Sequence, residues 1–222
     1  RARRSRIGDS PQTLEQVSEQ LVDYLSGMFI WGHPRSQINV VPAPTIPSVI
    51  GGLLPSIYNP NLCSDESSRK VAVSEVEAVA MSADLVGYDP AAAGGLFTFG
   101  GTGTLLYGAK IGLEQACPRT ATTGVAGPAV IAAPDQADYR SHTVENEIRT
   151  CLRESQLRSL LKAGRRVAAL VATMGTTDAF GLDDLAAVRQ IRDDLVDELS
   201  LDYRPHVHAD AVIGWAWSVF ND

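Results

Sequence analysis

The sequence of 222 residues is poor in lysine and cysteine and has no long apolar run. Its three cysteines, Cys63, Cys117 and Cys151, are widely spaced and form no Cys-x-x-Cys pair, which excludes a disulfide scaffold and is typical of reduced intracellular thiols. No apolar stretch approaches the ~20 residues that span a bilayer, and the basic start precedes a polar helix rather than an apolar signal core. These absences predict a cytoplasmic protein without a membrane partner.

The charge balance argues against a nucleic-acid-binding protein. The formal net charge is −7, and because four of the nineteen basic residues lie in the first six positions, the other 216 residues carry −11. An acidic body is repelled by a phosphate backbone. With 45% hydrophobic and 20% charged residues, the composition is that of an ordinary globular protein with no nucleic-acid partner.

The hydrophobic pattern predicts an α/β fold with a parallel-rich sheet flanked by helices, because strands and helices alternate. Strands are expected at 129–133, 167–172 and 206–212. Helices are expected in this region at about 104–116, 144–163 and 182–199, the last of them opened by Asp183. Earlier helices are expected at 11–28 after a Ser10 cap, at 46–57 after Thr45, and at 70–86, where Gly87 supplies the stop.

The strongest local feature is the glycine-rich turn from Gly94 to Thr104. Glycines surround Thr102 at the start of a helix, so that backbone amides and a hydroxyl can approach an anion closely. The spacing is neither the dinucleotide fingerprint nor the P-loop, because Ala109 stands between Gly108 and Lys110. The turn therefore predicts a phosphate site, and a tight turn without a ligand is the alternative.

A polar face is expected on the strand near the end of the chain. His206, His208 and Asp210 alternate with small apolar residues, which places all three on one side of the strand. A metal bound by these three residues, as in a hydrolase, would satisfy them. A ligand facing Asp210 at the carboxyl end of a parallel strand is a second solution. A third is that Asp210 caps the following turn, and we expect a structural role for His206.

Several motifs together resemble the pyridoxal-phosphate-dependent decarboxylases, the group that includes glutamate, tyrosine and aromatic-amino-acid decarboxylases. They follow the family's order and cover most of residues 31–222. The motifs are Trp31-Gly-His-Pro-Arg-Ser-Gln37, Thr45-Ile-Pro-Ser48, Tyr58-Asn-Pro-Asn61, Gly95-Leu-Phe-Thr-Phe-Gly-Gly-Thr-Gly-Thr104, Ala172-Thr-Met-Gly-Thr-Thr177 and His208-Ala-Asp-Ala211. The resemblance implies an incomplete large domain of the fold type I, aminotransferase-like fold over 49–222. It implies an amino-terminal helical and loop segment over 1–48 that serves dimerisation and the substrate entrance.

The resemblance also implies roles for four residues around pyridoxal 5′-phosphate. Gly101 and Thr102 would hold the phosphate, and Thr177 would contact the cofactor from the side. Asp210 would be a catalytic carboxylate that pairs with the pyridine nitrogen. A buried carboxylate keeps that nitrogen protonated, so that the ring can accept the electron pair left on Cα when carbon dioxide departs.

Two further sites are implied less directly. The family's ring-stacking histidine is matched here by Asp138, so His142 is the nearest candidate for the stacking role. The loop that lines the family's substrate entrance is matched by Asn39, Val40, Val41 and Pro42.

The cofactor lysine of the family has no counterpart before the chain ends at Asp222. Lys70, Lys110 and Lys162 have the pattern of solvated helix charges. We therefore expect the amino-terminal part of an amino-acid decarboxylase, a carboxy-lyase, that is active with a second polypeptide carrying the downstream half and that forms a homodimer once assembled. The alternatives are a catalytically inactive relative that acts as a binding or interaction subunit and, least favoured, the metal hydrolase.

Overall fold

The structure is a computed structural model that describes residues 7–8, 10–35, 43–124, 130–133, 148–150, 154–177 and 180–220. The chain divides into two compact units, Arg1–Ile46 and Pro47–Asp222. Among the described helices, none is long and apolar enough to cross a membrane. Cys63 and Cys117 are free thiols, and Cys151 lies outside the described residues.

Within its described residues, the first unit contains one complete helix, α1 (Leu14–Leu25). Its start differs from the expected Ser10 cap, because Thr13 forms a capping box with Gln16. The Thr13 side chain accepts a hydrogen bond from the Gln16 amide at 3.2 Å, and the Gln16 side chain accepts one from the Thr13 amide at 2.9 Å. None of the residues of α1 is buried.

Helices α2 (Ile46–Tyr58), α3 (Asp65–Ser68) and α4 (Val71–Leu85) come next, and α2 and α4 confirm two predicted helices. The predicted stop after α4 is also confirmed. Gly87 has φ +80° and its amide donates to Asp84, while the Tyr88 amide donates to the carbonyl of Ala83. This left-handed turn satisfies the last carbonyls of the helix, and glycine adopts it without strain.

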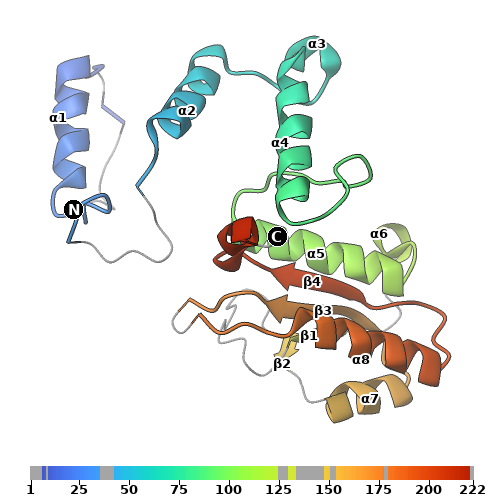
Figure 1. The fold of residues 1–222 in the computed structure, drawn as a ribbon. Coiled ribbons are helices and arrows are strands. Elements are labelled where there is room, and N and C mark those ends of the chain that lie inside the picture. The colour runs from blue at the N-terminus through green and yellow to red at the C-terminus, as the bar shows by residue number, and fades with distance from the viewer. Residues whose placement is uncertain are drawn as a thin grey trace. The chain divides into compact units, whose positions relative to one another are not determined.

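The remaining elements are α5 (Gly101–Ala116), α6 (Thr120–Thr123), β1 (Val130–Ala133), β2 (Ile148–Thr150), α7 (Glu154–Lys162), β3 (Val167–Thr173), α8 (Leu185–Glu198), β4 (His206–Asp210) and a 3-10 helix (Gly214–Phe220). The four strands form one sheet in the order β2-β1-β3-β4 (Figure 1), and every neighbouring pair is parallel. The predicted parallel α/β sheet is confirmed.

Two predicted elements are wrong in detail. The expected helix over 144–163 is the strand β2 followed by the shorter α7, because Ile148 pairs with Ile131 of β1 in the sheet. The cap of α8 is Asp184 rather than Asp183, whose carboxylate instead accepts a hydrogen bond from the amide of Thr173 at 2.6 Å. In both places a partner distant in sequence overrides the local helical pattern.

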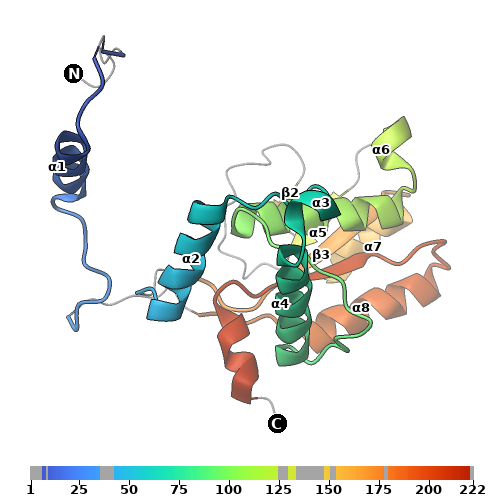
Figure 2. The same ribbon diagram turned by 90° about the horizontal axis from the view of Figure 1, so that it is seen from above.

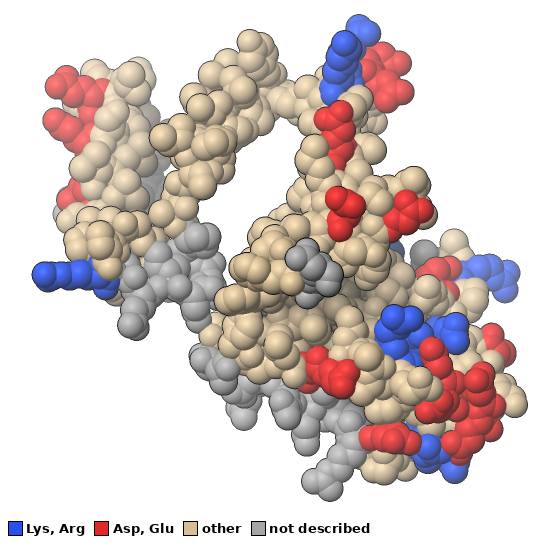
Figure 3. Space-filling model, in the orientation of Figure 1, with Lys and Arg blue, Asp and Glu red and all other residues tan. Residues whose placement is uncertain are grey.

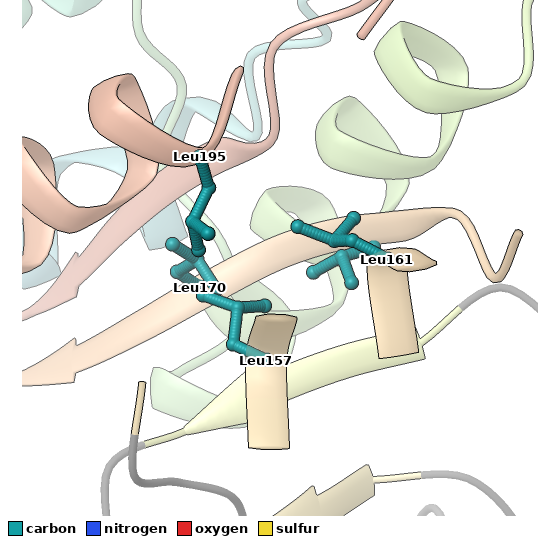
Figure 4. Close-up of a cluster of buried hydrophobic side chains, with 5 residues drawn as sticks. Leu157, Leu161, Leu170 and Leu195 are labelled. Carbon is teal, nitrogen blue, oxygen red and sulfur yellow. The ribbon is translucent and has the colours of Figure 1, made fainter. Parts of the chain in front are cut away.

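The two faces of the sheet are covered by different helices (Figures 1 and 2). Helix α5 lies on one face, and α7 and α8 lie on the other. The main hydrophobic cluster is on the second face, where Leu157 and Leu161 of α7 and Leu195 of α8 meet Leu170 of β3 (Figure 4). Leu195 is only 1% exposed. Burial of a leucine contributes about 1.5–3 kcal/mol, so this cluster anchors the sheet.

Candidate functional site

Helix α5 approaches the sheet closely because glycines face it. A Cβ atom at Gly112 would lie 2.5 Å from the carbonyl oxygen of Ala168 near the start of β3. A Cβ atom at Gly108 would lie 2.4 Å from Nδ1 of His208, in the middle of β4. Moving towards the amino end of α5 therefore means moving towards the carboxyl ends of the strands. Neither glycine was predicted to pack on the sheet, although their spacing of four residues within a helix was the available signal.

The first turn of α5 lies at the carboxyl edge of the sheet. A Cβ atom at Gly101 would be 3.4 Å from Cγ2 of Val212, which follows the last residue of β4, Asp210, by two positions. The carboxylate of Asp210 accepts a hydrogen bond from the Val212 amide at 3.4 Å. The predicted phosphate-binding residues and the predicted carboxylate are thus at the same edge of the sheet.

The glycine-rich turn itself becomes helical earlier than expected. Helix α5 starts at Gly101 rather than near residue 104, so Gly101 and Thr102 lie in its first turn. The cap residue Gly100 has φ +140°, a conformation that side chains disfavour. First-turn amides have no partner within the helix, and the first turn of α5 contains no acidic residue. This helix start suits an anion.

Gly103 has a different role from Gly100 and Gly101. A Cβ atom there would lie 3.0 Å from both Cβ of Thr98 and Cε1 of Phe99, and the residue is buried. Gly103 therefore allows the preceding loop to pack on the helix, and its contacts do not point to a ligand.

Thr177 lies in the loop that follows β3, at the same edge of the sheet. The loop folds back on itself, since the amide of Gly175 donates to the carbonyl of Gly181 at 3.2 Å. A Cβ atom at Gly175 would be 3.2 Å from the amide nitrogen of Gly214, so the loop packs on the segment after β4. The structure thereby brings the loop of Thr177, which is itself exposed, to the segment that follows Asp210.

Strand β4 is half-buried along its whole length, and it ends at Asp210 rather than at residue 212. Within the described part of the chain it pairs on one side only, with β3. Burial lowers the pKa of His208, and the charge of Asp210 opposes this shift. The pKa of His206 is also lowered, first by burial and then by His208 and Arg192. Both histidines therefore favour the neutral form in the folded chain.

The same three residues do not form a metal site. The described residues contain no group of three or more histidine, cysteine or acidic side chains that could hold a metal ion. His206, His208 and Asp210 are all among them, and the two imidazole rings are 6.2 Å apart between centroids. The metal-hydrolase alternative has no support in this geometry.

Two of the three lysines lie on helices and the third directly precedes one. Lys70 precedes α4, Lys110 lies within α5 and Lys162 ends α7, and all three are exposed. The predicted stacking residue His142 lies outside the described residues. So do the four residues of the predicted substrate entrance, Asn39, Val40, Val41 and Pro42.

No family model and no curated protein matches this chain. Solved structures do match. The crystal structure of mouse CSAD in apo form has a TM-score of 0.80 and 18% identity, and the match covers 96% of this chain and 47% of that chain. Tryptophan decarboxylase from Catharanthus roseus in complex with L-tryptophan has a TM-score of 0.73 and 18% identity, with 100% and 53% covered. This chain shares the fold of these solved structures.

A third match agrees with this assignment. The glutamate decarboxylase domain of diaminobutyrate-pyruvate transaminase and L-2,4-diaminobutyrate decarboxylase from Vibrio parahaemolyticus has a TM-score of 0.73 and 18% identity, with 98% of this chain and 51% of that chain covered. The chain spans about half the length of the solved structures that it matches. The decarboxylase fold confirms the predicted fold class and, at the level of fold, the resemblance seen in the motifs.

Proposed function

We propose that this chain is the amino-terminal part of a cytoplasmic, pyridoxal-phosphate-dependent amino-acid decarboxylase, a carboxy-lyase that acts together with a downstream portion bearing the cofactor lysine. One observation carries the proposal. In a decarboxylase fold, the amino end of α5 and the carboxylate of Asp210 lie at the same edge of a parallel sheet, where open α/β sheets bind their ligands.

The residues present fit pyridoxal phosphate. Its phosphate is an anion, and the first turn of α5 offers the amides of Gly101 and Thr102 and the Thr102 hydroxyl without a competing acidic side chain. Its ring nitrogen can be protonated, and Asp210 offers a carboxylate of opposite charge. Because His206 and His208 favour the neutral form, they add no positive charge that would compete for this carboxylate.

When bound, pyridoxal phosphate supplies an electron sink for the pair left on the substrate Cα as carbon dioxide leaves. The residues of this chain would do the positioning. Gly101 and Thr102 would bind the phosphate, Asp210 would hold a proton on the ring nitrogen, and the loop of Thr177 would orient the ring from the side. The lysine that anchors the cofactor would come from the downstream portion, since Lys70 lies exposed directly before a helix and Lys110 and Lys162 lie exposed on helices.

The distribution of charged and apolar side chains on the surface favours binding of a partner polypeptide. Charged side chains gather over α7 and α8, whereas α2 carries none (Figure 3). No residue of α2 is buried, and Ile50, Leu53 and Ile57 are among its exposed apolar side chains. In an assembly of this chain with the downstream portion, the exposed apolar helix α2 and the edge strand β4 would be covered. The proposal includes a homodimer of that assembly.

Cofactor binding can be tested on the chain itself. We expect the purified chain to bind pyridoxal phosphate, and binding can be followed by the fluorescence of its three tryptophans, of which Trp215 and Trp217 follow β4. Asp210→Asn should weaken binding about tenfold, because it removes a charge-assisted hydrogen bond. The matched control is Asp197→Asn on the exposed surface of α8. Equal affinities for the wild type and Asp210→Asn would contradict the assigned role.

The assembly is tested by purifying the tagged chain from its native cells. The expected result is a second, lysine-bearing polypeptide and carbon dioxide release from at least one amino acid of a panel, with release lost in Asp210→Asn. A preparation that contains this polypeptide alone, binds pyridoxal phosphate and releases no carbon dioxide would overturn the proposed activity. Such a result would favour the catalytically inactive binding subunit.

A further inference from the structure

The contact between His208 and Gly108 joins the two elements that carry the proposed cofactor site. Asp210 lies two residues beyond His208 on β4, and Gly101 and Thr102 lie on α5 six to seven residues before Gly108. At 1.5 Å per residue, the contact is about 10 Å from the first turn of the helix. A shift of α5 along the strand at this contact would therefore move the first-turn amides relative to the carboxylate.

We infer that His208 is a positioning residue, whose imidazole seats in the gap left by Gly108 and sets the height of α5 along β4. This inference rests on the proposed function and deepens it. The ring fits because a Cβ atom at Gly108 would lie 2.4 Å from Nδ1, 2.7 Å from Cε1 and 3.0 Å from Cγ. All three values are at or below the closest approach of real Cβ atoms, so the ring occupies the place of the missing side chain.

A second glycine contact differs in kind and supplies the comparison. Gly112 faces the backbone carbonyl of Ala168 at 2.5 Å and its carbon at 3.0 Å, measured from the Cβ position. That contact brings the helix close to the sheet but involves no side chain of β4. The Cβ position of Gly112 also lies 3.0 Å from Cβ of Ala169 on β3, so of these two contacts only the one at Gly108 involves a side chain of β4, the strand that ends in Asp210.

The surroundings of His208 fit a steric role. The ring lies on the α5-covered face of the sheet, in register with Val171 of β3, and is half-buried. Burial favours its neutral form. His206 shares the face but lies two residues earlier, opposite Ala169, and among the described residues it is not one of the nearest neighbours of any glycine of α5.

The experiment is a double-variant cycle with two readouts on the full 222-residue chain. The first is the melting temperature. The second is the ratio of the dissociation constants of pyridoxal and pyridoxal phosphate, which isolates the contribution of the phosphate. A change that only loosens the fold lowers both affinities alike and leaves the ratio unchanged, whereas a displaced helix start lowers the ratio.

We expect Gly108→Ala to lower this ratio about tenfold, the size of a lost charge-assisted hydrogen bond, and to lower the melting temperature. His208→Ala should lower the ratio severalfold by itself. In the double variant the new methyl group occupies part of the space of the removed ring. We therefore expect the ratio of dissociation constants and the melting temperature to recover most of the way to the wild-type values.

Two controls separate the steric pair from general damage. His208→Ala should not rescue Gly112→Ala, because that clash is with the backbone of Ala168. His206→Ala should neither lower the ratio nor rescue Gly108→Ala. If Gly108→Ala does not fold, His208→Ala and the double variant still decide the question, since the ring is then absent in both.

Three results would overturn the inference. One is an unchanged ratio in His208→Ala, another is no recovery in the double variant, and the third is an equal loss of affinity for both compounds. If the wild-type chain binds neither compound, the result contradicts the proposed function and, with it, the positioning role of His208. If the wild-type chain binds pyridoxal phosphate and the variants have the same ratio of dissociation constants as the wild type, only the positioning role of His208 is wrong.

Discussion

At the scale of single residues, the two histidines of β4 are titratable groups whose pKa is lowered in the folded chain. Burial is the main cause of the lowered pKa of both His206 and His208, and Asp210 offsets part of it only for His208. A histidine with a lowered pKa binds fewer protons in the folded chain than in the unfolded chain over the interval below its ordinary pKa of about 6.5.

This difference predicts a pH dependence of stability. Stability contributed by the neutral histidines is fully present above about pH 6.5 and is lost as the pH falls below it, because the unfolded chain takes up more protons. We expect the free energy of unfolding in urea to be lower at pH 5.5 than at pH 7.5, and His208→Gln to reduce this difference. His33→Gln, at an exposed histidine of the first unit, is the control. A chain that becomes more stable on acidification would contradict the prediction.

At the scale of elements, the connection from β3 to α8 is closed by one aspartate. The Thr173 amide donates to the Asp183 carboxylate at 2.6 Å, and the Asp183 amide donates to the Thr173 carbonyl at 2.9 Å. Thr173 is only 9% exposed, so its amide depends on this partner. The pair brackets the loop that contains Thr177.

Removing this bracket should affect both stability and the proposed site. We expect Asp183→Ala to lower the free energy of unfolding by about 1–3 kcal/mol, the cost of an unsatisfied buried donor, and to weaken pyridoxal phosphate binding. Asp183→Asn keeps an acceptor oxygen and should cost less. The control is Asp184→Ala, which removes the α8 cap for about 1 kcal/mol. Stability is measured by urea unfolding and binding by titration with pyridoxal phosphate. If Asp183→Ala binds pyridoxal phosphate as tightly as Asp184→Ala does, the Asp183–Thr173 pair does not position the loop.

At the scale of the whole molecule, β4 is an edge strand of the sheet that the described residues form. Within the described residues β4 pairs only with β3, whereas β3 pairs on both sides. The solved structures that share this fold are about twice as long as the chain. A half-paired strand next to the proposed site is therefore where we expect the proposed downstream portion to join.

Assembly should be visible in hydrogen exchange. We expect the β4 amides that face away from β3 to exchange more slowly once the lysine-bearing portion is bound, because they gain hydrogen-bond partners or lose solvent. The amides of β3 serve as the internal control and should change little. Equal exchange of β4 in the isolated and assembled chain would show that the downstream portion joins elsewhere.

The amino-acid sequence by itself determined the features that depend on neighbouring residues. The parallel α/β order, the stop at Gly87 and the anion-suited start of α5 follow from hydrophobic periodicity and from glycine conformations, which act over a few residues. The motifs around Thr102 and Asp210 predicted a fold that the solved structures share. The roles of these residues in binding remain predictions.

Only the tertiary structure decided the features that depend on distant partners. Strand β2 replaces part of a predicted helix because β1 lies beside it, and Asp183 leaves its predicted cap for the amide of Thr173. The contact of His208 with Gly108 joins residues one hundred positions apart, so no local pattern could reveal it. Strand β4 is half-buried because pairing and packing, which are long-range, set the burial of an edge strand.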